Sequence, residues 1–324
     1  MNKNIGYAIA LALAIAAPLY GYPVFLMKLL CFALFACAFN LLIGYTGLLS
    51  FGHAAFFGTA GYVAGNVLKL PGVSFEAGIL AGTAAAAVVG LVMGLLAIRR
   101  QGIYFAMITL ALAQMVYFGA LQLTDYTGGE DGLQGVPRSK LIGLLDLGND
   151  TVLYYVVLAI AVAGFALIVR TVHSPFGQVL KAIKENEPRA ISLGYDVDKY
   201  KLLAFVLSAA LAGLAGATNT AVQGFETLTD VHWSMSGLVI LMTLVGGMGT
   251  LAGPMLGAVI IIALENKLGD FGTFMAVHTG IEWFNTLGEA VSMVTGLIFV
   301  ACVLLFRRGI VGEVVARSKG GKPA

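Results

Sequence analysis

Long apolar runs restrict most strongly what this 324-residue chain can fold into. Runs of roughly 16 to 22 apolar residues recur along it, and about 20 residues of helix cross the roughly 30 Å hydrocarbon core of a bilayer. Because 59% of the residues are hydrophobic and 11% are charged, polar side chains are too few to cover a soluble globule of this size. The runs also lack the alternating pattern of a membrane β-barrel. The sequence therefore predicts an all-α, polytopic transmembrane helical bundle.

We expect about eight full spans and one broken, re-entrant pair of half-helices. The expected full spans are residues 5–20, 24–43, 54–69, 77–98, 103–122, 151–170, 202–221 and 289–306. The first imitates a secretory signal peptide, but another span follows almost at once, so we expect it to be retained. Residues 235–245 and 254–266 are too short to cross and are separated by glycines and a proline. Backbone groups freed at such a break must be satisfied by protein or by a wet cavity.

The basic residues give the expected direction of the chain. With the N-terminus in the cytoplasm, all but five of the 19 Lys and Arg residues fall on the cytoplasmic side, in agreement with the positive-inside rule. The five outside are Lys28, Lys69, Arg138, Lys140 and Lys267. A single long span over 235–266 would instead place Arg307 and Arg308 outside. We therefore expect the half-helix pair to enter and leave on the outer face, with both termini cytoplasmic.

No segment outside the membrane is long enough to fold as a soluble domain. The longest expected outer loops are residues 123–150 and 267–288, and the first is acidic and rich in turn-forming residues. Residues 1–311 are therefore expected to form one membrane domain. Residues 312–324, which include several basic side chains, are expected to form an unstructured cytoplasmic tail.

The chain also lacks the motifs of common enzymatic chemistry. It has no G-x-x-x-x-G-K-[ST] loop for nucleotide phosphates, no H-E-x-x-H and no G-x-S-x-G. Cys31, Cys37 and Cys302 lie in apolar runs without metal-ligand spacing. No expected span carries a charge near its centre, where ion-driven carriers often keep an acidic ligand. We therefore predict no catalytic activity, no cofactor and no metal site, and the lack of a central charge counts against an ion-driven carrier.

A polar segment at residues 172–200, which we call the coupling segment, separates two apolar runs. Its basic residues place it in the cytoplasm. Residues 178–184 favour a helix, and a second short helix can begin at Pro188 and end at Gly194. Such a segment is either a solvated connecting loop or a short helix that docks in a partner's groove and passes motion to the spans.

Three glycine-rich or apolar segments carry a resemblance to a known family. They are residues 40–65 (NLLIGYTGLLSFGHAAFFGTAGYVAG), 102–118 (GIYFAMITLALAQMVYF) and 237–257 (GLVILMTLVGGMGTLAGPMLG). They resemble the permease subunits of bacterial branched-chain amino acid ABC transporters, and are most similar to the M-type permeases of the leucine/isoleucine/valine system. The resemblance covers residues 24–310, nearly the whole chain.

The resemblance implies a permease of a binding-protein-dependent importer that moves branched-chain amino acids across the bacterial inner membrane. The implied partners are a second permease, identical or paralogous, two cytoplasmic ABC ATPase subunits, a periplasmic substrate-binding protein and the lipid bilayer, with no nucleic acid. Permeases for urea and short-chain amides share the glycine-rich segments, so this substrate class stays an alternative. An ion-driven carrier or channel acting alone is another, and an enzyme is a more distant one.

The resemblance also suggests which residues act. Glu187, Ala190 and Gly194 match the family's ATPase-coupling loop, whereas Pro188-Arg189 replaces its alanine pair. The expected ATPase-coupling residues are Lys181, Glu185, Glu187, Arg189, Ala190 and Gly194. The expected pathway residues are Asn40, Ser50, His53, Thr109, Gln114, Thr243, Gly246, Gly247 and Gly249. The outer face that would receive the binding protein includes residues 123–150 and 223–233.

Overall fold

The computed structural model describes residues 11–19, 21–141, 146–279, 293–294, 296–297, 300 and 309–318. Helices make up most of this part of the chain, which confirms the all-α prediction. The helices are η1 (Ala17–Leu19), α2 (Pro23–Thr46), α3 (His53–Leu68), α4 (Phe75–Ala97), α5 (Ile103–Gln122), α6 (Thr124–Thr127), η2 (Gly129–Asp131), α7 (Asp150–His173), α8 (Pro175–Glu185), α9 (Glu187–Ser192), α10 (Val197–Gln223), α11 (Leu228–Val231), α12 (Trp233–Gly246), α13 (Gly253–Thr279) and α15 (Gly309–Ser318). The expected span 5–20 is described only at residues 11–19, the expected span 289–306 lies largely outside the described residues, and Cys302 lies outside them.

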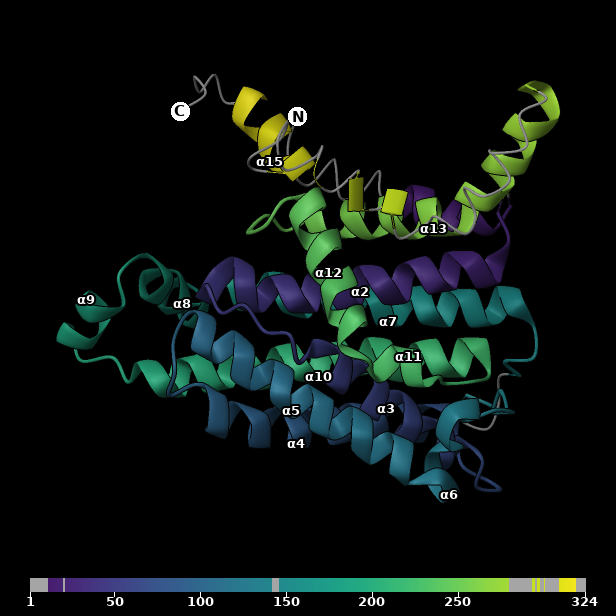
Figure 1. The fold of residues 1–324 in the computed structure, drawn as a ribbon, viewed down its shortest axis with the longest axis horizontal. Coiled ribbons are helices and arrows are strands. Elements are labelled where there is room, and N and C mark those ends of the chain that lie inside the picture. The colour runs from purple at the N-terminus through teal and green to yellow at the C-terminus, as the bar shows by residue number, and fades with distance from the viewer. Residues whose placement is uncertain are drawn as a thin grey trace.

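The long helices run side by side along the molecule (Figure 1). Within the described residues, five of them, α2, α4, α5, α7 and α10, are long and apolar enough to cross a membrane. Each corresponds to an expected span. The span expected at residues 54–69 corresponds to α3, which has 16 residues and is therefore slightly shorter than a typical crossing helix.

Helices α2 and α10 form the centre of the bundle. In the most apolar stretch of α2, 78% of the residues are buried, and in that of α10 the share is 67%. In the corresponding stretches of α4, α5 and α7, only 22–33% of the residues are buried. Small residues allow this close packing. A β-carbon added at Gly216 of α10 would lie 2.1 Å from the carbonyl oxygen of Phe57 on α3. On the periphery, α4 exposes an apolar face that suits lipid, formed by Leu80, Val88, Leu91, Val92, Leu95 and Leu96.

The broken pair appears as α12 and α13. Helix α12 has 14 residues, as expected of a half-helix, and crosses the long helices steeply (Figure 1). Gly247 follows the end of α12 and has a φ of 123°, a backbone conformation that residues other than glycine rarely adopt. We call residues 246–250 the glycine turn. After it, α13 packs against both α12 and α2.

Two boundary predictions require correction. Helix α13 has 27 residues and continues to Thr279, whereas we predicted a half-helix over 254–266 and an outer loop from 267. Glu265 and Lys267 lie within the helix, since Glu and Lys are good helix formers. The tail was predicted to be unstructured from residue 312, yet α15 continues to Ser318. Helix α15 packs against α12 and α13, so this part of the chain is attached to the bundle.

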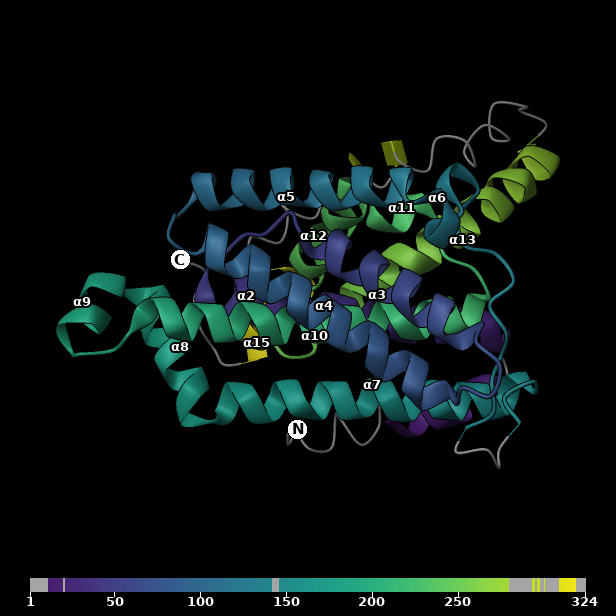
Figure 2. The same cartoon turned by 90° about the horizontal axis from the view of Figure 1, so that it is seen from below.

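The coupling segment folds as two short helices that project from one end of the bundle (Figures 1 and 2). Each helix begins at a side chain that accepts a backbone N–H: Ser174 for α8, Asn186 for α9 and Asp196 for α10. Such caps satisfy amides that have no partner within the helix. Pro188 lies in the first turn of α9 and Gly194, with φ of 87°, follows its end. Both positions agree with the helix predicted from the sequence.

Candidate coupling and translocation sites

The tip of the coupling segment carries exposed apolar side chains. Ile183, Ala190 and Val197 form a small apolar core that joins α8, α9 and the start of α10. Around it, Ile191, Leu193 and Tyr195 are 57%, 68% and 39% exposed; we call these three residues the tip patch. A cluster of large apolar side chains on a polar projection is typical of a surface that contacts another protein.

The expected coupling residues separate into internal and surface positions. Glu187 Oε1 lies 2.6 Å from Lys201 Nζ and accepts a hydrogen bond from Gln101 Nε2 (2.9 Å). These contacts hold α9 against α10 and against the connection between α4 and α5. Ala190 is buried in the small core, and Gly194 ends α9. The other three predicted coupling residues lie at the surface or partly exposed: Lys181, Glu185 and Arg189.

The Glu187–Lys201 pair predicts a measurable contribution to stability. The side chains of Glu187 and Lys201 are 21% and 3% exposed, so replacing Glu187 with leucine leaves a buried ammonium without its countercharge. Fully buried pairs lose about 3–5 kcal/mol in this way, and we expect about 2 kcal/mol here. The Tm of the purified protein should fall. The double variant Glu187→Leu/Lys201→Met should recover most of the loss, and failure to do so would contradict the pairing.

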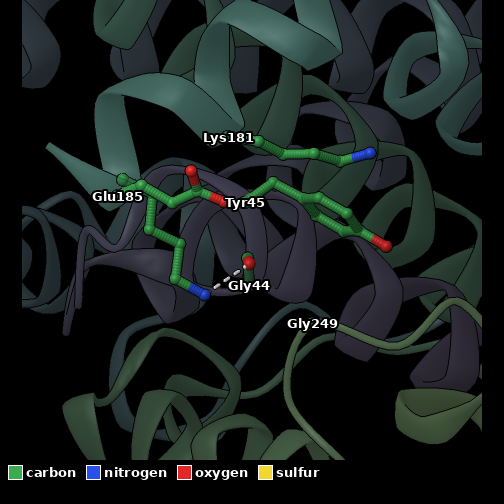
Figure 3. Close-up of a pocket in the computed structure, with 6 residues that line it drawn as sticks. Gly44, Tyr45, Lys181, Glu185 and Gly249 are labelled. Atoms are coloured by element: carbon green, nitrogen blue, oxygen red, sulfur yellow. Dashed lines mark hydrogen bonds between the residues drawn. The ribbon is translucent and has the colours of Figure 1, made fainter.

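A hollow of about 340 Å³ lies between the coupling segment and the bundle, lined by Gly44, Tyr45, Lys181, Lys184, Glu185 and Gly249. In Figure 3 the side chains from α8 face the end of α2 across this hollow. Lys184 Nζ donates a hydrogen bond to the carbonyl oxygen of Gly44 (2.7 Å). Partial burial lowers the pKa of Lys184 from its ordinary value. A lysine at this place also complements the negative C-terminal end of the α2 dipole.

Asn40 binds the glycine turn to α2. Its Nδ2 donates to the carbonyl oxygen of Thr250 (2.8 Å), and its Oδ1 accepts from the backbone N–H of Gly249 (2.8 Å). Asn40 is buried, so both bonds form away from water. A polar side chain therefore satisfies backbone groups of the turn, as a break within the membrane requires. Because Gly44 lies one turn further along α2, Lys184 and Asn40 connect α8 to the glycine turn through the same helix end.

Three other expected pathway residues, Ser50, Thr109 and Thr243, are fully buried and bonded to backbone. Ser50 Oγ accepts from the N–H of Gly52 (3.1 Å). Thr109 Oγ1 donates to Ala106 (2.9 Å) and accepts from the N–H of the residue after Ser50 (3.2 Å). Thr243 donates to a carbonyl of its own helix (2.9 Å). Gln114 of α5 is half-buried. A role of these residues in translocation stays a prediction.

His53 is enclosed at the start of α3. Ser208 donates its hydroxyl proton to the carbonyl oxygen of Ala38 (2.6 Å). His53 Nε2 lies 2.8 Å from the Ser208 hydroxyl oxygen. Because the serine hydroxyl has a single proton, His53 Nε2 must be protonated and donate the hydrogen bond to Ser208. Aromatic rings surround the imidazole at 4.9 to 6.3 Å: Phe39, Phe56 and Phe205. In this packing His53 contacts aromatic rings and the polar groups of α2 and α10.

The two segments expected on the outer face lie together. Leu133 and Glu226 exchange both backbone hydrogen bonds (2.9 Å each), and the N–H of Val136 donates to the carbonyl oxygen of Gly224 (2.8 Å). Arg138 forms an ion pair with Asp150 at the start of α7. The loop after α5 and the segment after α10 are therefore parts of one surface.

Two residues that the sequence did not single out as site residues have distinctive surroundings. Lys184 was one of several charges on α8, although it lies on the same helix face as Lys181, three positions away. Glu226 was part of an expected outer loop, yet the structure buries it completely. Only the return of residues 224–232 into the bundle reveals this burial.

Comparisons with known proteins agree with the resemblance. A family model described as "Branched-chain amino acid transport system / permease component" matches residues 24–307. The high-affinity branched-chain amino acid transport system permease protein LivM of Salmonella typhimurium is 30% identical over 264 residues, 74% of this chain and 62% of the relative. LivM of Escherichia coli is 28% identical over 263 residues, with the same coverage. The chain thus spans less than two thirds of the length of either LivM protein.

An archaeal relative matches over more of its own length. The probable branched-chain amino acid transport permease protein LivH of Methanocaldococcus jannaschii is 26% identical over 278 residues, which is 82% of this chain and 84% of the relative. The similarity therefore extends over both the long helices and the broken pair.

Proposed function

The chain belongs to the family of branched-chain amino acid transport system permease components, and we propose that it is the membrane subunit of a binding-protein-dependent ABC importer. It would form the translocation pathway for branched-chain amino acids, together with a second permease subunit. The observation that carries the proposal is the α8–α9 projection. Its exposed tip patch offers a docking surface on a chain without a nucleotide-binding motif.

In this proposal, ATP hydrolysis takes place in two cytoplasmic partner subunits. Their movement displaces α8 and α9. Lys184 transmits the displacement to the end of α2, and Asn40 transmits it to the glycine turn and α12. A rigid connection of this kind supports coupling, because small shifts can switch packed helices between discrete arrangements.

The same proposal gives the orientation of the chain. The coupling segment and both termini lie in the cytoplasm, and the protein resides in the bacterial inner membrane. The surface formed by residues 123–141 and 223–233 faces the periplasm and receives the substrate-binding protein. The joined backbone of these two segments supports a single docking face. The pathway binds its solute weakly, so that the solute leaves on the inner side.

Uptake by the complete assembly tests the substrate class. The purified permeases, ATPases and binding protein are reconstituted in proteoliposomes, and ATP-dependent uptake of labelled leucine is measured. We expect unlabelled isoleucine and valine to compete and urea not to compete. Competition by urea or short-chain amides, with no effect of valine, would favour the alternative cargo. Uptake that stops when an ion gradient collapses, while ATP remains, would favour an ion-driven carrier.

Replacing Leu193 with glutamate is expected to weaken binding of the ATPase subunits by more than about tenfold. Leu193 belongs to the tip patch and is 68% exposed, so the change should leave the fold intact while adding a charge to an apolar contact. A central interface residue contributes about 2 kcal/mol or more. Co-purification and ATP-dependent uptake measure the effect. Gln178→Glu, exposed on α8, is the matched control, and equal binding by both variants would contradict docking at the tip.

A further inference from the structure

Glu226 is a completely buried carboxyl near the outer end of the bundle. Its exposed fraction is 0%, and within the described residues its Oε1 has no hydrogen-bond partner. Glu226 also forms no ion pair within the described residues. The carboxyl packs directly on Gly61, where a β-carbon would lie 2.4 Å from the Glu226 side chain. A buried ionisable group in a membrane protein indicates a functional site.

The Thr220 hydroxyl has two oxygen neighbours and a single proton to share between them. Its hydroxyl lies 3.1 Å from the carbonyl oxygen of Gly216 and also contacts Glu226 Oε2. A hydroxyl has one proton, and a backbone carbonyl only accepts. If Thr220 donates to Gly216, its contact with Glu226 requires a proton on the carboxyl. A neutral Glu226 therefore satisfies both contacts at once, whereas a carboxylate satisfies only one of them.

The surroundings oppose a negative charge at this place. Removing a carboxylate from water without a partner costs several kcal/mol, so such groups tend to become neutral. The titratable groups that face Glu226 are Asp230 of α11 and Tyr62 of α3, with Tyr117 of α5 next to Tyr62. Lys28 of α2 interacts electrostatically with Asp230. A second carboxyl adds repulsion, and the buried Tyr62 hydroxyl has no hydrogen-bond partner among the described residues.

We propose that Glu226 is a proton-binding site, occupied while the outer segments are packed over it. The backbone of Glu226 itself joins these segments, because its N–H and its carbonyl oxygen both bond to Leu133. Opening of this surface would expose the carboxyl to the outer solution and release the proton. By linkage, acid pH stabilises the closed outer packing and alkaline pH destabilises it. The proposal does not depend on which solute the protein carries.

Infrared difference spectroscopy on the purified full chain in lipid nanodiscs tests the proton directly. At neutral pH the wild-type spectrum minus the Glu226→Gln spectrum should contain the carbonyl band of a protonated carboxyl. Thr220→Val should shift that band, because it removes the hydroxyl that contacts the acid. If the difference spectrum shows carboxylate bands instead, the proposal is wrong. Thr220→Val keeps the test usable if Glu226→Gln does not fold, since a wild-type spectrum without a Thr220-sensitive band would also overturn it.

Thermal unfolding against pH gives an independent readout. A carboxyl that is protonated in the folded state and ionised in the unfolded state makes stability fall as pH rises. From pH 5 to 8 the wild-type Tm should therefore fall by a few degrees more than that of Glu226→Gln. Glu130→Gln, which changes an exposed acid of the loop after α5, should behave like the wild type. If Asp230→Asn removes the pH dependence and Glu226→Gln does not, the proton belongs to Asp230 and the assignment to Glu226 fails.

Discussion

Replacing Gly246 with alanine is expected to destabilise the protein by several kcal/mol and to reduce the yield of folded material strongly. A β-carbon at Gly246 would lie 1.9 Å from the carbonyl oxygen of Gly253 and 3.0 Å from the N–H nitrogen of Gly257. These are backbone atoms of α13, so no side chain can rotate to make room. Overpacking a core costs about 1–3 kcal/mol and occasionally more, while the total stability of a domain is only about 5–15 kcal/mol.

Gly237 offers a matched control in the same helix. It lies on α12, and a β-carbon added there meets no heavy atom within 4 Å. Gly237→Ala should therefore be neutral or stabilising by about 0.5–1 kcal/mol, because alanine restricts the unfolded chain. Thermal unfolding of the two purified variants compares them directly. Equal Tm values would contradict the close crossing of α12 and α13.

Replacing Asn40 with leucine is expected to separate ATP hydrolysis from uptake. The change removes both hydrogen bonds to the glycine turn and leaves the Gly249 N–H and the Thr250 carbonyl without that partner. Each buried group left unsatisfied costs about 1–3 kcal/mol, so the turn should detach from α2. In the reconstituted assembly we expect uptake to fall more than about tenfold, which corresponds to about 1.4 kcal/mol. ATP hydrolysis should change much less.

One control variant and one second test variant accompany this experiment. Thr83→Val removes a hydroxyl that donates to the carbonyl oxygen of Ile79 in its own helix (2.8 Å) and should leave the ratio of uptake to hydrolysis unchanged. Lys184→Met breaks the preceding connection and should lower the same ratio. If both residues serve one connection, the double variant Asn40→Leu/Lys184→Met should be little worse than the single variants. Additive losses, or equal losses of uptake and hydrolysis, would contradict a shared connection.

The sequence could predict the features that depend on local chemistry. The apolar runs located the long helices, and the glycines at 246–250 located the end of α12. Pro188 and Gly194 bounded α9, because each residue restricts the backbone by itself. The end of α13 was missed, since charged residues within a helix do not stop it.

The roles of individual polar side chains depend on distant partners. Asn40 and Gly249 are 209 positions apart, and His53 and Ser208 are 155 apart, so no periodic pattern could pair them. Glu187 matched a coupling motif, but the motif does not reveal its ion pair with Lys201, 14 positions further along the chain. Glu226 lay in a segment expected at the surface, and its burial depends on how residues 224–232 return into the bundle.

The most direct test of the coupling account compares two reconstitutions in liposomes. In one the chain is alone, and in the other it is assembled with its second permease, ATPases and binding protein. Leucine gradients are measured with ATP on the side of the ATPases. We predict uphill accumulation only in the complete assembly, only with ATP, and abolished by Leu193→Glu at the tip patch. Uphill accumulation by the chain alone, driven by an ion gradient, would contradict the account.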